Sequence, residues 1–67
     1  MLKANELKSE VARNEMTLEE LARFLGINTS TLNRKMYGKS DFYRNEIVQI
    51  ANILHLSQER INAIFFA

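Results

Sequence analysis

Hydrophobic residues recur along this chain at spacings of three and four positions, which is the period of an amphipathic helix. The first such segment runs from about Lys3 to Arg13, with Leu7 and Val11 on one face. Asn14, the next residue, is suited to the left-handed conformation that ends a helix. No stretch alternates for long enough to favour a strand, and the chain contains no proline. The pattern therefore predicts an all-helical protein.

The second predicted helix has clear signals at both ends. Thr17 can cap its first amides, and Glu20, three residues later, can reach back in a capping box. Its buried face consists of Leu18, Leu21, Ala22 and Leu25. Gly26 ends this helix, and a further helix must begin after only Ile27 and Asn28. With so short a connection the two helices cannot lie antiparallel and must cross steeply, as in a helix-turn-helix.

Two more helices are predicted in the last part of the chain. One runs from about Arg44 to His55, with an apolar face formed by Ile47, Ile50, Ala51 and Leu54. Ser57 is placed to cap a short last helix, whose apolar face is formed by Ile61, Ile64 and Phe65. The expected core consists of Leu7, Val11, Leu21, Ala22, Leu25, Ile27, Leu32, Met36, Phe42, Ile47, Ile50, Leu54, Leu56 and Ile61. The pattern predicts one five-helix domain over residues 1–67.

Length and composition exclude several classes of protein. A chain of 67 residues is near the size at which a single core just offsets the entropy of ordering the backbone. It has no cysteine, so it forms neither a disulfide framework nor a thiolate metal site. No apolar run reaches the roughly 20 residues of a membrane span, and the first residues lack the apolar segment of a signal peptide. We therefore expect a protein of the reducing cytosol.

Charge is unevenly distributed along the chain. The formal net charge is only +1, but residues 1–26 carry −1, residues 28–45 carry +3 and residues 46–67 carry −1. The positive part contains Arg34, Lys35, Lys39 and Arg44. A polyanion would attract and orient this part of the chain, although an ordinary solvated face would look the same.

The helix that follows Asn28 has an exposed face rich in hydrogen-bonding groups. Leu32 and Met36 define its buried side, and a step of about 100° per residue places Arg34 opposite them. Its N-terminus, at Asn28 and Thr29, is the end that projects into the major groove when such a helix docks. The candidate base-contact residues are Asn28, Thr29, Ser30, Asn33 and Arg34.

Two of these residues have alternative interpretations. Arg34 could donate two hydrogen bonds to O6 and N7 of a guanine, or it could be solvated or contact a phosphate. Asn28 could contact a base, or it could simply cap the helix.

The candidate phosphate contacts are Lys35, Tyr37, Lys39 and Arg44. Lys35 is nearest the core, so we expect its stem to cover apolar surface and its charge to point outward.

The run from Thr17 to Ser40 resembles the helix-turn-helix of the lambda repressor and Cro type, the XRE-like family. Ala22 stands at the small position of the first helix, Gly26 and Ile27 at the turn, and Leu32 at the buried position of the second helix. The segments that extend this similarity to small Cro-like regulators of phages and prophages in Gram-positive bacteria are Leu32–Phe42, Glu46-Ile47 and Ile64–Phe66.

The resemblance implies a lambda repressor-like fold in which the second and third helices form the helix-turn-helix and the base-contact residues face the groove. It also implies a bacterial host cell, with the protein at the nucleoid. Three positions depart from the family pattern. The family usually has an apolar residue where Lys35 stands, and often glutamine at Leu18 and Thr29. The contacts of those glutamines are therefore not transferred to this chain.

The sequence thus predicts a DNA-binding transcriptional regulator that acts as a symmetric homodimer on a near-palindromic operator in double-stranded DNA. Ile64, Phe65 and Phe66 are expected to build the dimer, with Phe65 in the core and Phe66 on the partner. No nucleophile and base stand out, so we expect no enzyme activity, and likewise no cofactor, metal, small-molecule ligand or membrane. The alternative is a helical protein-interaction module, of anti-repressor or antitoxin type, that uses its apolar C-terminal tail.

Overall fold

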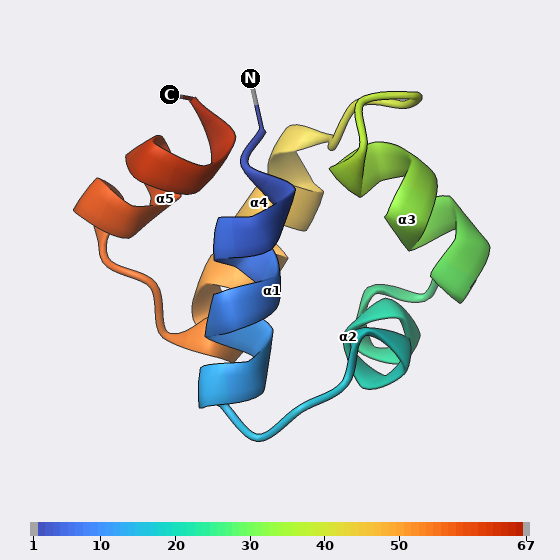
Figure 1. Cartoon of the computed structure of the whole chain (residues 1–67), viewed down its shortest axis with the longest axis horizontal. Coiled ribbons are helices and arrows are strands. Elements are labelled where there is room, and N and C mark those ends of the chain that lie inside the picture. The colour runs from blue at the N-terminus through green and yellow to red at the C-terminus, as the bar shows by residue number, and fades with distance from the viewer. Residues whose placement is uncertain (1, 67) are drawn as a thin grey trace.

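The computed structural model describes residues 2–66 and contains five helices in this range (Figure 1). They are α1 (Ala4–Arg13), α2 (Leu18–Leu25), α3 (Thr29–Met36), α4 (Arg44–Leu54) and α5 (Gln58–Phe65). No strand occurs between residues 2 and 66. The predicted all-α class and the order of the helices are confirmed.

The helix boundaries follow the local signals in the sequence. The amide of Glu20 donates to Thr17 Oγ1 at 3.1 Å, and the amide of Thr17 donates to Glu20 Oε1 at 2.9 Å, which completes the predicted capping box of α2. Gly26 ends α2 in the left-handed region with φ 74°. Ser57 Oγ accepts from the amide of Arg60 at 3.2 Å and so caps α5 as expected.

The end of α1 differs from the prediction. Asn14 has φ −89°, and the left-handed conformation falls one residue later, at Glu15 with φ 57°. The side-chain amide of Asn14 instead donates to the carbonyl of Glu10 at 2.8 Å and to the carbonyl of Leu54 at 3.2 Å. Asn14 therefore links the end of α1 to the end of α4.

The core takes residues from all five helices. The buried hydrophobic residues are Leu7, Val11, Leu21, Ala22, Leu32, Met36, Ile50, Ala51, Leu54, Ile64 and Phe65. Among the other residues predicted for the core, those that only pack half-buried against its edge are Leu25, Ile27, Phe42, Ile47, Leu56 and Ile61. Such burial is worth about 1.5 to 3 kcal/mol for each large side chain, so the central residues dominate the stability.

The C-terminal tail is divided between the core and the surface. Ile64 is fully buried, Phe65 is 9 % exposed and Phe66 is 64 % exposed. The ring of Phe65 meets Phe42 edge-on, with 5.4 Å between ring centroids. The prediction that Phe65 lies in the core is confirmed. The sequence predicted that Ile64 and Phe65 contact the partner in a dimer. This prediction is corrected, because both side chains are buried within their own protomer.

The arrangement of the helices leaves α3 at one edge of the molecule and α5 at the opposite edge (Figure 1). α2 packs against both α3 and α4, while α1 packs against α2 and α5. The amide of Lys3 also donates to the carbonyl of Ile64 at 2.9 Å, which ties the start of α1 to α5. Within residues 2–66, no helix has the length and apolar character needed to cross a membrane.

Candidate nucleic-acid interface

α3 is held by a buried side and presents a polar side to solvent. Leu32 and Met36 are 0 % and 1 % exposed. On the other side, four of the five candidate base-contact residues are exposed and Thr29 is half-buried. The helix is therefore fixed along one face, and its opposite face can approach a ligand without any rearrangement of the core.

Asn28 occupies the N-cap position of α3 but does not act as a side-chain cap. Its backbone is extended, with φ −75° and ψ 154°, and its side chain makes no capping hydrogen bond. The exposed amide of Asn28 is thus left for a contact outside the helix. The capping interpretation of this residue is not supported by the geometry.

The C-terminal end of α3 brings further polar side chains together. Asn33, Arg34, Tyr37 and Lys39 line one shallow hollow of about 270 Å³. The chain turns back here because Gly38 adopts φ 83°, and the amide of Lys39 donates to the carbonyl of Arg34 at 2.9 Å. Arg34 itself is exposed and forms no ion pair with any residue between 2 and 66. Two predicted base contacts and two predicted phosphate contacts therefore lie side by side.

Lys35 does not point outward as expected. Its side chain is only 7 % exposed, and its ammonium donates to Glu46 Oε1 and to the carbonyl of Asp41, both at 3.0 Å. The ammonium also lies 4.3 Å from the centroid of the Tyr43 ring. A charge so engaged is not available to a phosphate. We correct the prediction accordingly, since Glu46 provides an internal partner that made burial of the lysine possible.

A comparison with known protein families matches residues 6–61 to the Cro/C1-type HTH DNA-binding domain. The chain belongs to this family. Its five helices and the short connection between α2 and α3 agree with that assignment, which confirms the resemblance seen in the sequence and supports a DNA-binding regulator. Among curated proteins and among solved structures, no significant match was found.

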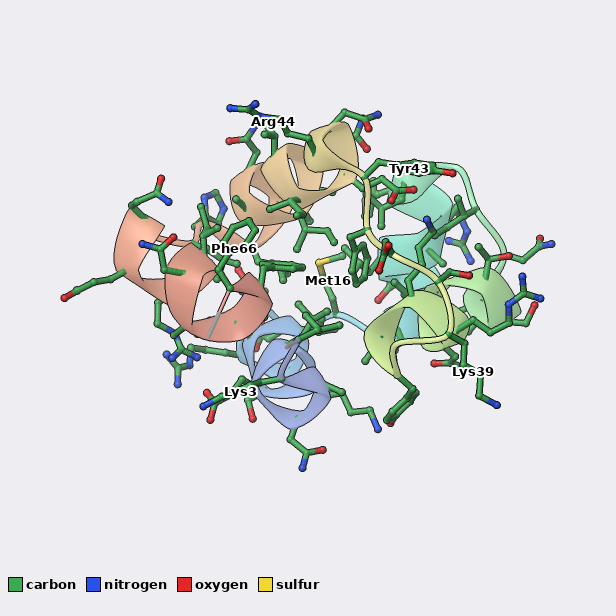
Figure 2. The ribbon with its side chains drawn as sticks, turned by 90° about the horizontal axis from the view of Figure 1, so that it is seen from above. Lys3, Met16, Lys39, Tyr43, Arg44 and Phe66 are labelled. Atoms are coloured by element: carbon green, nitrogen blue, oxygen red, sulfur yellow. The ribbon has the colours of Figure 1, made fainter. Side chains whose placement is uncertain are left out.

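Arg44 lies apart from the other predicted phosphate contacts of the Cro/C1-type domain. Figure 2 shows Lys39 beside the end of α3 and Arg44 at the start of α4, on another part of the surface. The side chain of Arg44 lines a groove between α4 and α5 instead. The structure thus separates two cations that are only five positions apart in the sequence.

Lys8 is an additional cation near α3 that the sequence did not reveal. Its ammonium lies 5.1 Å from the centroid of the Tyr37 ring, so α1 contributes positive charge beside the last turn of α3. Tyr37 is 55 % exposed. Because these two residues are 29 positions apart in the chain, no local pattern could have paired them.

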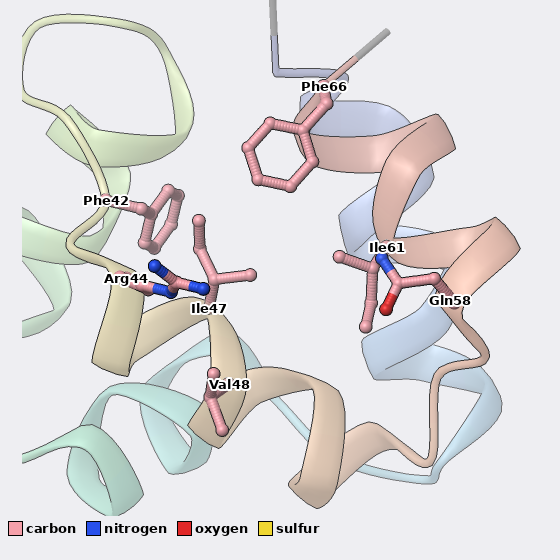
Figure 3. A pocket seen from close by; sticks show the side chains of 7 residues that line it. All are labelled: Phe42, Arg44, Ile47, Val48, Gln58, Ile61 and Phe66. Carbon is pink, nitrogen blue, oxygen red and sulfur yellow. The ribbon is translucent and has the colours of Figure 1, made fainter.

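A groove with a largely apolar lining runs between α4 and α5 (Figure 3). It has a volume of about 510 Å³ and is lined by Phe42, Arg44, Ile47, Val48, Gln58, Ile61 and Phe66. Val48 and Phe66 are 53 % and 64 % exposed. Exposed apolar side chains of this kind are suited to a protein contact.

Proposed function

We propose that this Cro/C1-type domain is a sequence-specific transcriptional regulator, of the type found in phages and prophages, that inserts α3 into the major groove of an operator at the bacterial nucleoid. The observation that carries the proposal is the two-sided character of α3. Leu32 and Met36 fix its inner side, while an exposed row of amides, hydroxyls and one guanidinium forms its outer side.

In this complex Arg34 would donate two hydrogen bonds to O6 and N7 of a guanine. Asn28 and Thr29 at the N-terminus of α3, together with Ser30 and Asn33, would contact neighbouring base edges. Lys39 and the hydroxyl of Tyr37 would contact phosphates at the other end of the helix. This division matches the general rule that phosphate contacts position a protein and base contacts select the sequence.

The domain would bind as a symmetric dimer through the α4–α5 groove. A two-fold interface places the same patch of both protomers face to face. In such an arrangement Phe66 of each protomer would be buried between the two grooves, against Val48. Ile64 and Phe65 would act only indirectly, by holding Phe66 in place from within the core.

The dimer is tested by substitution of Phe66. We expect Phe66→Ala to shift the sedimentation coefficient from the dimer toward the monomer value at equal protein concentration. Phe24→Ala is a matched control, because Phe24 is 67 % exposed on α2 and lies outside the groove. A parent protein that is monomeric at high concentration, or an equal effect of both substitutions, would contradict the dimer.

The DNA function is tested by selection of bound sequences from a random pool of duplexes. An enriched palindrome with half-sites about one helical turn apart supports the proposal. Arg34→Ala carried through the same selection should lose preference at one base pair of each half-site. No enrichment with the parent protein would leave the protein-interaction module, whose contact surface would be the same apolar groove.

A further inference from the structure

The ammonium of Lys35 makes its contacts inside the protein. A lysine ammonium has three N–H donors. Two of them meet Glu46 Oε1 and the carbonyl of Asp41, each at 3.0 Å, and the nitrogen lies 4.3 Å from the centroid of the Tyr43 ring. The side chains of Lys35 and Glu46 are 7 % and 9 % exposed. This charge is therefore an internal component of the fold.

The partner carboxylate connects a second element to the same point. Glu46 Oε1 accepts the amide of Tyr43 at 2.7 Å as well as the ammonium of Lys35. A single oxygen atom thus joins α3, the segment that follows it and the first turn of α4. That segment carries Lys39, which lies beside Arg34 in the hollow at the end of α3.

We propose that the Lys35–Glu46 pair is a positioning element that fixes α3 relative to the segment 39–43 and to α4, and so helps to determine sequence specificity. The specificity part of this inference rests on the proposed function. A buried ion pair is a poor source of net stability, because removing both charges from water offsets their attraction. Its hydrogen bonds are directional, however, and permit one relative placement of the two helices, whereas a pair of apolar side chains could slide.

Loss of the Lys35–Glu46 pair should affect specific and non-specific DNA binding differently. The charges of Lys35 and Glu46 cancel, and neither faces solvent. Replacing both by neutral residues leaves the net charge and the exposed cations unchanged, so the electrostatic attraction to any DNA should persist. Base contacts, in contrast, require that α3 and the phosphate contacts fit the duplex at the same time. Loss of the pair should therefore reduce the preference for the operator over other sequences.

The test variant is Lys35→Met with Glu46→Gln. Methionine resembles lysine in length and shape, and the glutamine oxygen can still accept the amide of Tyr43. A matched control is Arg60→Met with Glu10→Gln, which also leaves the net charge unchanged and removes a pair joined at 2.8 Å between α5 and α1. Both variants and the parent are measured against the selected operator and a scrambled duplex of equal length at one salt concentration.

We expect the Lys35→Met, Glu46→Gln variant to be folded by circular dichroism. Its Kd for the operator should be at least tenfold higher than that of the parent, whereas its Kd for the scrambled duplex should stay within twofold. In the control variant the Kd for the scrambled duplex divided by the Kd for the operator should equal that of the parent. A Lys35→Met, Glu46→Gln variant that is folded and keeps the same ratio as the parent overturns the proposal.

If that variant does not fold, Glu46→Asp provides a second measurement. It keeps both charges and shortens the reach of the carboxylate by one methylene, so that one oxygen can no longer serve Lys35 and Tyr43 together. We expect the Kd for the scrambled duplex divided by the Kd for the operator to fall at least threefold. An unchanged ratio overturns the proposal.

Amide hydrogen exchange of the free protein distinguishes a failure of positioning from a failure of the DNA function. In the variants that weaken the pair, exchange at Lys39, Tyr43 and Ile47 should accelerate at least tenfold relative to Leu21 in α2. If the parent selects no DNA, the proposed function fails and exchange alone decides the positioning claim. Faster exchange confined to the amides of Lys39, Tyr43 and Ile47 then supports the positioning role of the pair. Unchanged exchange at these amides overturns it.

Discussion

Replacing Arg34 by alanine is the sharpest test of how the domain recognises DNA. Arg34 is exposed on α3 and has no ion-pair partner among residues 2–66, so its truncation removes no internal contact of this kind. The loss of a positive charge from the last turn of a helix costs about 0.3 to 1 kcal/mol. For a domain of this size that lowers the Tm by at most about 8 °C. Binding can therefore be measured on a folded protein.

The expected loss of binding is larger than the loss of stability. A bidentate contact between arginine and guanine contributes about 1 to 3 kcal/mol of base discrimination. A dimer on a palindrome makes this contact twice, so the operator complex should lose about 2 to 6 kcal/mol if the half-sites act independently. Because 1.4 kcal/mol corresponds to a factor of ten, the Kd should rise between about 30-fold and 10⁴-fold.

The assay is a fluorescence anisotropy titration with the selected operator and with duplexes in which each base pair of both half-sites is replaced in turn. The parent should lose affinity most strongly at one position of each half-site, and Arg34→Ala should bind equally well whichever base occupies it. An unchanged profile with unchanged affinity would refute the assignment of Arg34 to a base. A uniform loss with an unchanged profile would assign Arg34 to a phosphate instead.

Three further predictions follow from the same geometry. Lys39→Ala should weaken binding to all sequences alike and lower the slope of log K against log salt by about one; a loss confined to the operator contradicts this role. Thr17→Ala removes the cap of α2 and should cost about 1 kcal/mol, or about 4 to 8 °C in Tm by thermal unfolding; an unchanged Tm contradicts it. The hydrogen bond from Arg60 holds the pKa of Glu6 below its ordinary value of 4.5, so this contribution to stability is present above pH 4.5 and is lost as the pH falls through the lowered pKa. Arg60→Met should make the Tm less sensitive to pH over that acidic range, and parallel Tm curves for both proteins would contradict the role of Arg60.

The fold could be predicted from sequence because its signals are local. Thr17 and Glu20 are three positions apart, and the glycine that ends α2 follows directly after Leu25. A period of three to four residues then shows which face of each helix is buried. The polar side of α3 was predictable for the same reason, since the positions of Leu32 and Met36 alone determine which residues lie opposite them.

Contacts between distant residues were not predictable in this way. Helical periodicity placed Lys35 at the edge of the core, but it gave no indication that Glu46, on another helix, would draw the ammonium inward. Arg60 pairs with Glu6 and Glu10, which are 54 and 50 positions away, although the local sequence offers it Glu59 as a neighbour. Such partners depend on how the helices are placed in space.

These long-range contacts change the expected electrostatics of DNA binding. Lys35 is neutralised by Glu46, and Arg44 lies at the groove, so the cations left for phosphate contacts near the candidate base-contact residues are Lys39 and Lys8. If each of these two neutralised one phosphate, a single protomer would give a salt slope of about −2, against about −4 for a dimer. Non-specific attraction of one protomer is then weak, and useful affinity requires both half-sites together. The exposed groove that would join two protomers is therefore as necessary to the proposed regulator as α3 itself.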